Sequence, residues 1–378
     1  MFKEVITVEV AIMGAGLSGL ACAITLEANG ISPTILEKRG LPGDRFVNAE
    51  LFFTLFSRPI DDPVAYFSDK YGIYINPVSD ITEIKFYSQN HAGTLNGRLG
   101  FSNIRGRHPD STDNQLAKQV KSPITYNSKY TYGEIKKEFT HVILATGDAI
   151  DAKDAGNFTE SVRASLKGGT VTGDFEVNKT YIWLNNNLAP QGYGYLIPYT
   201  TKEAHLAIGY PEYPQTMKEP IHNLWEKFYS QACKDLKQDF RITDNFEISG
   251  QMMGISKYPR VGNTFFTGNC LGSLMPAFGF GQIPSILSGI YAAYDILGLG
   301  DYGKLTKKFY TSYKNSLIIR RAAETLDNND YDKIVMGLKH PVISKMVSNN
   351  KYDAFKIASY LLRPWYNLKK LNSNARGK

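Results

Sequence analysis

The sequence predicts an α/β fold made of a parallel sheet, a second, antiparallel sheet and a helical C-terminal region. Three observations carry this prediction. Residues 8–40 read as a strand, a glycine-rich turn, a helix and a second strand. The middle of the chain holds short aromatic and β-branched runs separated by polar turns. Beyond residue 301, apolar residues recur at helical spacing.

The composition is that of a globular protein large enough for two or three domains. Of its 378 residues, 43 % are hydrophobic and 21 % are charged, which excludes a disordered chain and a multi-span membrane protein. The net charge of +7 favours anionic partners, but it is spread along the chain and accompanies no nucleic-acid motif. We therefore expect no nucleic-acid partner.

The cysteines Cys22, Cys233 and Cys270 show neither metal-ligand nor C-x-x-C spacing, so we expect reduced thiols and no metal site. The apolar N-terminus is interrupted by acids and its glycines suit a nucleotide turn, so we expect no cleaved signal peptide. Glycines, prolines and Asp295 interrupt the apolar run 265–299, which makes it a poor bilayer span. These features indicate a cytoplasmic protein, at most peripheral to a membrane.

Residues 5–13 are rich in β-branched and apolar residues without clean alternation, as in a strand buried on both faces of a parallel sheet. In the G-x-G-x-x-G turn that follows, the first glycine allows the tight turn and the second lets a pyrophosphate approach the backbone. The third lets the next helix, predicted over 17–29, pack on the strand. Free N–H groups at the start of that helix would face phosphates. The turn residues expected at a cofactor are Gly14, Ala15, Gly16, Leu17, Ser18 and Gly19.

The second strand, SPTILEK, ends in an acid. Glu37 follows the glycines by about 20 residues, where a carboxylate can bond ribose hydroxyls, and Lys38 comes next. A glycine turn alone could merely pack a helix on a sheet. With strand, helix and acid in register, we predict a dinucleotide site, although this unit does not choose between NAD and FAD.

Two later segments favour FAD. The strand in FTHVILATGD ends in the small residues Ala145 and Gly147, which let a backbone pass close to a cofactor. Residues 263–297 then contain a strand, a Gly268-Asn269 step, a loop with close-approach glycines and a helix from about Gln282. The positive end of that helix can stabilise negative charge on a reduced flavin. NAD needs no such third element.

In this order the three segments resemble FAD-dependent oxidoreductases of the glutathione-reductase-like superfamily, and within it the geranylgeranyl reductase family. Gly268 and Asn269 stand at that family's Gly-Asp step, whose aspartate bonds the ribityl chain. The family's proline, its G-x-G pair and its cofactor-contacting arginine correspond to Pro276, Gly279, Gly281 and Arg45. The resemblance implies that these residues bind FAD. One departure is that the loop 41–50 lacks the cysteine that many members carry there.

The aromatic runs KTYIWLNNN, GYGYLIPY and AHLAIGY predict an antiparallel sheet beside the first one. Residues 190–198 resemble the family's P-x-x-Y-x-W-x-F-P strand, which lines a prenyl-binding cavity, with tyrosine for tryptophan and isoleucine for phenylalanine. The resemblance implies a substrate wall of Pro190, Tyr193, Tyr195, Ile197 and Pro198. From the residues alone, the two tyrosines project to one face of a strand, where they could equally form an aromatic cluster that only packs the sheet.

The predicted domain division follows these motifs. Segments 1–75, 100–165 and 250–300 would form a Rossmann-like FAD-binding domain. Segments 76–99 and 166–249 would form the antiparallel substrate domain, and 301–378 the helical region. Helix breaks are expected near 327–331 and 348–350. The basic, amphipathic segment 351–378 could rest on an anionic membrane or pack on the body as an ordinary helix.

The resemblance implies an FAD-dependent oxidoreductase that reduces carbon–carbon double bonds of the isoprenoid chain of a prenyl lipid, by hydride transfer from reduced flavin. No separate NAD(P)H-binding unit is evident, so the electron donor would be a ferredoxin or transiently bound NAD(P)H. No catalytic residue is assigned, although Tyr193 and Tyr195 are positional candidates for the proton donor.

Two alternatives remain at the level of the sequence. One is an FAD-dependent monooxygenase, hydroxylase or halogenase; the absence of a W-x-W-x-I-P motif argues against the tryptophan-halogenase branch. The other is a prenyl-binding protein without redox activity, in the manner of Rab GDP dissociation inhibitors. The intact third segment argues against loss of the cofactor in this chain.

Overall fold

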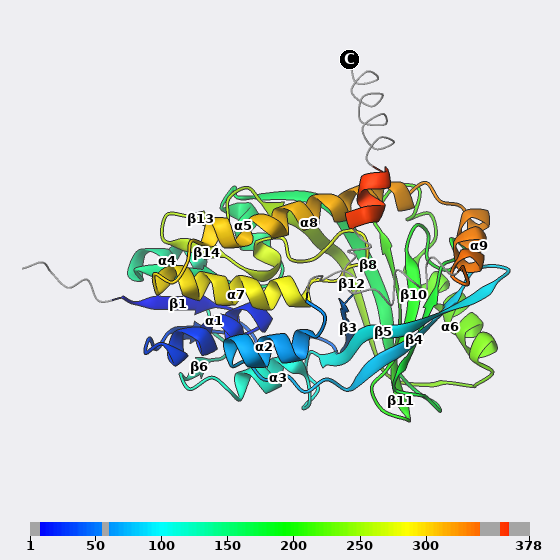
Figure 1. Cartoon of the computed structure of the whole chain (residues 1–378), viewed down its shortest axis with the longest axis horizontal. Coiled ribbons are helices and arrows are strands. Elements are labelled where there is room, and N and C mark those ends of the chain that lie inside the picture. The colour runs from blue at the N-terminus through cyan, green and yellow to red at the C-terminus, as the bar shows by residue number, and fades with distance from the viewer. Residues whose placement is uncertain (1–7, 55–59, 341–355, 363–378) are drawn as a thin grey trace, which may run out of the picture.

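The computed structural model describes residues 8–54, 60–340 and 356–362. Two β-sheets stand side by side, the smaller to the left and the larger to the right in Figure 1. Helices cover both faces of the smaller sheet and one face of the larger one. The predicted combination of a parallel sheet, a second sheet and a helical C-terminal region is confirmed.

The smaller sheet has six strands in the order β13-β14-β7-β1-β2-β6. Every neighbouring pair is parallel except the antiparallel pair β13–β14. The strands are β1 (Val10–Met13), β2 (Thr34–Leu36), β6 (Ile124–Thr125), β7 (His141–Leu144), β13 (Arg260–Val261) and β14 (Thr264–Phe266). Within the described residues, the first strand is shorter than the predicted span 5–13, and residues 1–7 lie outside the description.

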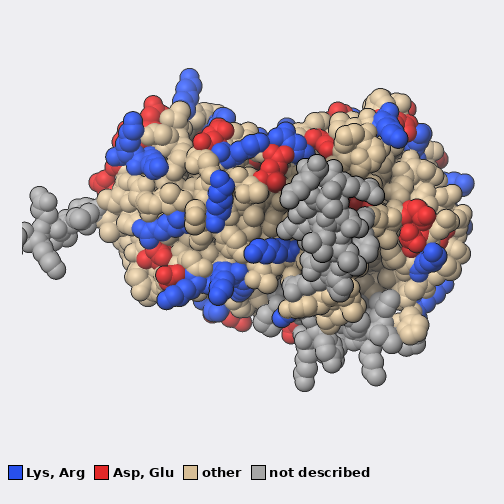
Figure 2. Space-filling model, turned by 90° about the horizontal axis from the view of Figure 1, so that it is seen from above, with Lys and Arg blue, Asp and Glu red and all other residues tan. Residues whose placement is uncertain are grey.

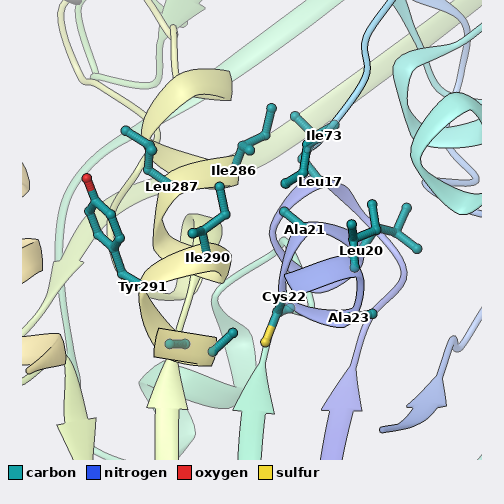
Figure 3. Packing of buried hydrophobic residues seen from close by; sticks show 14 of the residues in the cluster. Leu17, Leu20, Ala21, Cys22, Ala23, Ile73, Ile286, Leu287, Ile290 and Tyr291 are labelled. Carbon is teal, nitrogen blue, oxygen red and sulfur yellow. The ribbon is translucent and has the colours of Figure 1, made fainter. Parts of the chain in front are cut away.

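One face of this sheet packs against two helices, α1 (Leu17–Ala28) and α7 (Gln282–Ile296). Figure 3 shows their apolar side chains interlocking above the strands. The helices approach so closely that a Cβ added to Gly289 of α7 would lie 1.9 Å from the carbonyl oxygen of Ser18. Because α1 and α7 are apolar nearly all round, both are buried between the sheet and other helices.

The opposite face of the sheet is also covered, which explains why β1 shows no alternation of apolar and polar residues. Val10 and Ile12 belong to the core beneath α1 and α7, whereas Ala11 and Met13 belong to a second core. The helices that contribute to this second core are α4 (Tyr132–Glu138) and α5 (Ile150–Asp154).

The larger sheet has eight strands in the order β12-β8-β11-β10-β9-β4-β5-β3. Its pairs are antiparallel except β4–β9, which is parallel. The strands are β3 (Asn48–Phe53), β4 (Ser79–Tyr87), β5 (Ala92–Arg105), β8 (Phe158–Thr172), β9 (Lys179–Trp183), β10 (Tyr193–Pro198), β11 (Glu203–Pro211) and β12 (Arg241–Ser256).

Helix α6 (Ile221–Leu236) covers one face of the larger sheet, and a cavity lies against the other face. Strand β10 shows the division. Leu196 packs in the core under α6, and a Cβ on Gly194 would lie 2.3 Å from the Phe228 ring of α6. Tyr193 and Tyr195, which alternate with these residues, point to the cavity instead.

The chain passes more than once between the two sheets. Strand β3 belongs to the larger sheet although its residues fall within the predicted FAD-binding segment 1–75, and β8 begins at Phe158, inside the segment 100–165. The division of the chain into domains at the predicted boundaries remains a proposal.

The C-terminal region crosses from one sheet to the other on α8 (Tyr302–Ala323). At its start, the Tyr302 hydroxyl donates a hydrogen bond of 2.6 Å to the carbonyl of Phe266 in the smaller sheet. At its end, Nη2 of Arg321 donates one of 3.0 Å to the carbonyl of Ser161 in the larger sheet. The helix therefore clamps the two sheets together above the cavity.

The structure also contains the short helices α2 (Pro63–Tyr71), α3 (Thr112–Ala117) and α9 (Asn328–Gly337) and the 3-10 turn η2 (Gly268–Cys270). The helix break expected near 327–331 is present, because Asp327 and Asp330 form a capping box at the start of α9. The break expected at 348–350 lies outside the described residues, as does most of the basic segment 351–378, of which residues 356–362 are helical.

In the described ranges, no helix has the length and apolarity needed to cross a bilayer. The three cysteines are unpaired thiols, and Cys22 and Cys270 are buried. On the face shown in Figure 2, Lys and Arg side chains are mixed with Asp and Glu side chains over both halves of the molecule.

Candidate active site

A cavity of about 1110 Å³ lies between the two sheets. Its walls come from the carboxyl ends of β1, β2 and β7, from the loop before α7, and from β3, β8, β9, β10, β11 and β12. Ligands of open α/β sheets bind at the carboxyl ends of parallel strands. The cavity therefore joins a dinucleotide position to the bare face of the second sheet.

At the dinucleotide end, the three glycines of the turn differ in what surrounds them. Gly14 has a φ of +111°, and a Cβ there would lie 2.3 Å from the carbonyl oxygen of Ala145. A Cβ on Gly19 would lie 2.0 Å from the carbonyl oxygen of Gly14. Gly16 has no atom within 4 Å of its Cβ position, and it lines the cavity. The turn therefore needs its outer glycines for packing, while the middle glycine keeps space open for a ligand.

The buried carboxylate of Glu37 holds this turn in shape. One oxygen accepts a hydrogen bond of 2.7 Å from the N–H of Ala15, and the other accepts one of 2.9 Å from the N–H of Arg39. Each carboxylate oxygen has a further lone pair, and Glu37 lines the cavity. The acid can therefore organise the phosphate turn and still accept a bond from a ribose hydroxyl.

Asn269 stands where the resembled family has the aspartate of its Gly-Asp step, and its amide makes two hydrogen bonds. Its Nδ2 donates a hydrogen bond of 2.7 Å to the carbonyl of Gly147, and its Oδ1 accepts one of 3.2 Å from the Ser273 hydroxyl. An aspartate could not donate to that carbonyl in its charged form. The amide thus ties the loop after β14 to the end of β7 at the cavity wall. The preceding Gly268 adopts a φ of +56° and donates its N–H to Ser288 of α7.

Arg45 reaches the same wall from the loop after β2. Its Nη2 lies 3.5 Å from the Cβ position of Gly147, and its Nη1 donates a hydrogen bond of 3.5 Å to Oε1 of Gln251 on β12. Burial lowers the pKa of Arg45, followed by repulsion from Arg39. A half-buried cation at the end of β7 is suited to an anionic ligand.

A partly buried ionic cluster that no sequence motif indicates lies where the two sheets meet. Arg105 donates two hydrogen bonds to Asp113, of 2.7 and 3.1 Å, and one of 3.2 Å to Glu50. Burial would lower the pKa of Arg105, but Asp113 and Glu50 raise it above its ordinary value. Glu50 also accepts a hydrogen bond from Nε2 of Gln282, the first residue of α7.

This cluster fixes the start of α7 against β3, and all four side chains line the cavity. Oε1 of Gln282 is buried with no hydrogen-bond partner in the described part of the chain. Of these four residues, only Gln282 is indicated by the sequence, because it directly follows the G-x-G pair. Glu50, Arg105 and Asp113 lie in segments without a motif.

The tyrosine strand forms the opposite wall. Tyr193, Tyr195 and Ile197 line the cavity, and the Tyr193 hydroxyl donates a hydrogen bond of 2.5 Å to the carbonyl of Phe278 in the loop before α7. The Tyr195 hydroxyl lies 3.3 Å from Nε2 of His205 on β11. Burial raises the pKa of both tyrosines and lowers that of His205 to about 3, so all three side chains are neutral at physiological pH.

The structure brings most of the predicted site residues to this one cavity. Those that line it are Gly14, Gly16, Leu17, Ser18, Glu37, Lys38, Arg45, Ala145, Gly147, Asn269, Pro276, Gly279, Gly281, Tyr193, Tyr195 and Ile197. Five others are not among the lining residues: Ala15, Gly19, Gly268, Pro190 and Pro198. Ala15, Gly19 and Gly268 instead shape the backbone around the cavity, through the contacts described above.

The geometry fits a cofactor that carries negative charge at two places. Helix α1 begins after Gly16 and helix α7 after Gly281, and neither has a side-chain cap or an acid in its first turn. Both helix starts line the cavity. Uncapped N-termini present free N–H groups and a positive dipole end. They suit a pyrophosphate at α1 and the pyrimidine side of a reduced flavin at α7.

Comparison with known proteins agrees with this geometry. The family of NAD(P)-binding Rossmann-like domains matches residues 12–72. No curated protein sequence matches the chain. Among solved structures, a geranylgeranyl bacteriochlorophyll reductase-like protein from Thermoplasma acidophilum is similar at 16 % identity and a TM-score of 0.69, over 94 % of this chain and 98 % of that one.

Two further structures represent other activities. A flavin-dependent brominase is similar at 14 % identity and a TM-score of 0.64, over 98 % of this chain and 100 % of the other. A 2-methyl-3-hydroxypyridine-5-carboxylic acid oxygenase is similar at 16 % identity and a TM-score of 0.55, over 90 % of this chain and 95 % of the other. At such identities the likeness establishes the fold. The chain contains a Rossmann-like dinucleotide-binding domain within a fold shared by flavin-dependent enzymes, which supports FAD as its cofactor.

Proposed function

We propose that this protein is an FAD-dependent oxidoreductase that reduces carbon–carbon double bonds of an isoprenoid chain. The observation that carries the proposal is the single cavity that runs from the phosphate turn, past the start of α7, to the tyrosine wall of β10. When bound, FAD supplies the hydride chemistry. The resemblance of residues 190–198 to a prenyl-binding strand supports the substrate class.

The walls around the tyrosine strand suit an apolar chain. Leu166, Ile182, Ile248, Met253 and Leu274 line the cavity there. Isolated alkenes are poor hydride acceptors, so alignment of the chain and exclusion of water must lower much of the barrier. A wall of large apolar side chains favours both, because it holds the chain and displaces water from it.

Tyr195 is the better placed of the two tyrosines to deliver the proton. The Tyr193 proton is engaged by the Phe278 carbonyl. The Tyr195 hydroxyl faces a neutral imidazole, and when Nε2 of His205 carries the hydrogen and donates it, the phenolic proton is free to point into the cavity. In that tautomer, His205 would also stabilise the phenolate left after proton transfer.

A flavin-dependent hydroxylase or other monooxygenase is the second candidate. Its support is that the fold is similar to that of an oxygenase and of a brominase. A prenyl-binding protein without redox activity is the weaker alternative, because the phosphate turn keeps an open cradle at Gly16.

The test begins with the flavin content of the purified protein, since a protein that takes up no FAD contradicts both enzymatic candidates. The loaded protein is then reduced anaerobically and mixed with a prenyl lipid. We expect product masses that rise by two hydrogens per bond reduced. Unchanged lipid under these conditions, with oxygen added to a substrate in air, would identify the hydroxylase.

A matched variant tests the substrate wall in the same assay. Replacing Tyr193 and Tyr195 by alanine should impair lipid turnover and leave the flavin content unchanged, because neither tyrosine lies at the phosphate turn. Unaltered turnover would show that β10 does not line the substrate site.

Mixing the oxidised protein with reduced ferredoxin or with NAD(P)H, and following flavin bleaching, identifies the electron donor. Flotation with anionic vesicles tests the proposed peripheral contact with membranes.

A further inference from the structure

We propose that Gly209 makes the cavity selective for a methyl-branched chain, because its missing side chain leaves a notch that receives one branch. The notch is the open space over Gly209, between Tyr193 and Leu166. This inference deepens the proposed function, on which it rests for the nature of the chain. It is carried by the position of one glycine in the larger sheet and by the side chains on either side of it.

Gly209 lies inside the larger sheet and faces the cavity. It belongs to β11, which pairs with β10 on one side and with β8 on the other. Its neighbours Ile208 and Tyr210 are 0 % and 3 % exposed and pack in the core under α6, whereas Gly209 is half-buried and lines the cavity. Because side chains alternate along a strand, the Cβ position of Gly209 points away from that core and into the cavity.

Neither the backbone nor the packing requires a glycine at this position. The φ of Gly209 lies outside the positive range that favours glycine. Among the described residues, the atom nearest to an added Cβ would be Cγ of Leu166 at 3.5 Å, an ordinary van der Waals distance. Other glycines in the strands of this sheet differ, since a Cβ on Gly168, Gly169 or Gly194 would lie 2.5, 2.1 or 2.3 Å from another atom. Those glycines prevent clashes, whereas Gly209 leaves space open.

Two large side chains border the notch. Tyr193 on β10 stands directly opposite Gly209 on one side, and Leu166 on β8 stands opposite it on the other. Both line the cavity. Neighbouring strands lie about 4.8 Å apart, so the notch is one strand wide and as deep as one missing side chain. Its walls are an aromatic ring and an aliphatic side chain, which favour an apolar group.

A methyl branch is the group that matches such a space. An isoprenoid chain carries a methyl branch on every fourth carbon of its backbone, whereas a straight hydrocarbon chain carries none. Burial of one methyl group in an apolar site favours binding roughly fourfold. A straight chain would leave the notch unfilled and would forgo this gain.

The notch also lies close to the loop before α7. The Tyr193 hydroxyl, at one wall of the notch, donates a hydrogen bond of 2.5 Å to the carbonyl of Phe278 in that loop. A branch seated over Gly209 would therefore fix the position of the chain relative to the start of α7. Because the branches recur along the chain, the possible positions would differ by whole isoprene units.

The experiment compares two saturated alcohols with the same eight-carbon backbone. Octanol is unbranched, and tetrahydrogeraniol carries two methyl branches. Neither contains a double bond, so calorimetric titration into the FAD-loaded, oxidised protein measures binding without turnover. We expect tetrahydrogeraniol to bind more tightly than octanol to the natural protein.

Gly209→Ala should weaken binding of tetrahydrogeraniol by roughly fourfold or more and leave binding of octanol unchanged. Its midpoint of thermal unfolding should not fall, because alanine replaces a strand glycine without a clash. Leu166→Phe fills the notch from the β8 side and should have the same effect on binding, which covers the case that Gly209→Ala does not fold. The matched control is Gly133→Ala, which adds a methyl group on α4 away from the cavity wall and should leave both affinities unchanged.

Equal weakening for both alcohols in Gly209→Ala, or no weakening for either, would overturn the inference. Loss of FAD from this variant would do the same, because it would mean that the cofactor fills the notch. Failure here is separable from failure of the proposed function. A protein that selects branched chains through Gly209 but reduces no double bond keeps the notch and loses the reductase assignment. One that reduces prenyl chains with an unchanged branch preference in Gly209→Ala does the reverse.

Discussion

The hydroxyl oxygen of Tyr195 lies 3.3 Å from Nε2 of His205, on the neighbouring strand of the larger sheet. His205 is fully buried, its ring stacks on that of Phe246 at 5.4 Å, and its Nδ1 has no hydrogen-bond partner in the described ranges. The cavity-lining phenol of Tyr195 therefore contacts an imidazole that is buried away from water.

We expect Tyr195→Phe to slow oxidation of the reduced flavin by a prenyl substrate by about 10²-fold or more, because a positioned proton donor contributes on that scale. Tyr193→Phe is the control, since its hydroxyl is bound to a backbone carbonyl. Rapid-mixing measurements of flavin absorbance give both rates. Equal effects of the two substitutions would contradict the assignment of Tyr195, rather than Tyr193, as the proton donor.

The burial of His205 should make the protein less stable in acid. Burial lowers its pKa from 6.5 to about 3 in the folded state. Between these values the unfolded chain binds a proton that the folded chain does not, so the free energy of unfolding falls as pH falls from about 6.5 towards 3. The slope for one such group is about 1.4 kcal/mol per pH unit.

Urea unfolding at several pH values, compared between the natural protein and His205→Gln, isolates this contribution from that of the carboxylates. The variant should show the shallower decline. His222→Gln serves as the control, because His222 is exposed and pairs with Glu226 at the surface. Parallel curves for the natural protein and His205→Gln would contradict the assignment.

In G-x-G-x-x-G, we expect an alanine substitution at an outer glycine to lower stability and one at the middle glycine to lower FAD affinity. Gly19→Ala places a methyl group 2.0 Å from the Gly14 carbonyl and should cost about 1–3 kcal/mol of stability through overpacking. Gly16→Ala meets no protein atom within 4 Å, so it should fold normally and lose FAD affinity by roughly tenfold or more, or about 1.4 kcal/mol. Thermal unfolding of the apoprotein and FAD titration separate the two effects. Full FAD affinity in Gly16→Ala would place the pyrophosphate elsewhere.

Asn269→Asp should destabilise the protein even though aspartate is the residue of the resembling family. The carboxylate loses the 2.7 Å hydrogen bond to the Gly147 carbonyl and sets a negative charge against that oxygen. The expected cost is about 1–3 kcal/mol in the free energy of unfolding. Chemical denaturation of the apoprotein measures it, with Ser273→Ala as a control that removes only the second bond of the amide. An unchanged midpoint would show that the amide is not needed there.

Much of the fold could be predicted because its signals are local. The glycine turn, the helix that follows it and Glu37 lie within one short segment, and their spacing alone predicts a strand-turn-helix-strand unit. The alternation along β10 likewise predicts that Tyr193 and Tyr195 share a face, because side chains in a strand repeat every second residue. Both predictions agree with the structure.

Other features could not be read from such patterns. Strand β3 looked like part of the nucleotide-binding segment, yet it pairs with β5 in the larger sheet. The cluster of Glu50, Arg105, Asp113 and Gln282 draws its members from separate segments, and only Gln282, directly after the G-x-G pair, stands beside a motif in the sequence. Hydrogen bonds across such distances depend on how the sheets are placed, which local periodicity does not encode.

The sequence by itself thus determined the nucleotide unit, the second sheet and the helical C-terminal region, because each follows from turn chemistry and residue periodicity over a few positions. Only the tertiary structure decided what meets at the cavity. It places Tyr193 and Leu166 on either side of Gly209, and His205 behind Tyr195. Burial and open space at those contacts arise from packing between separate strands, and they set the chemistry that we propose for the site.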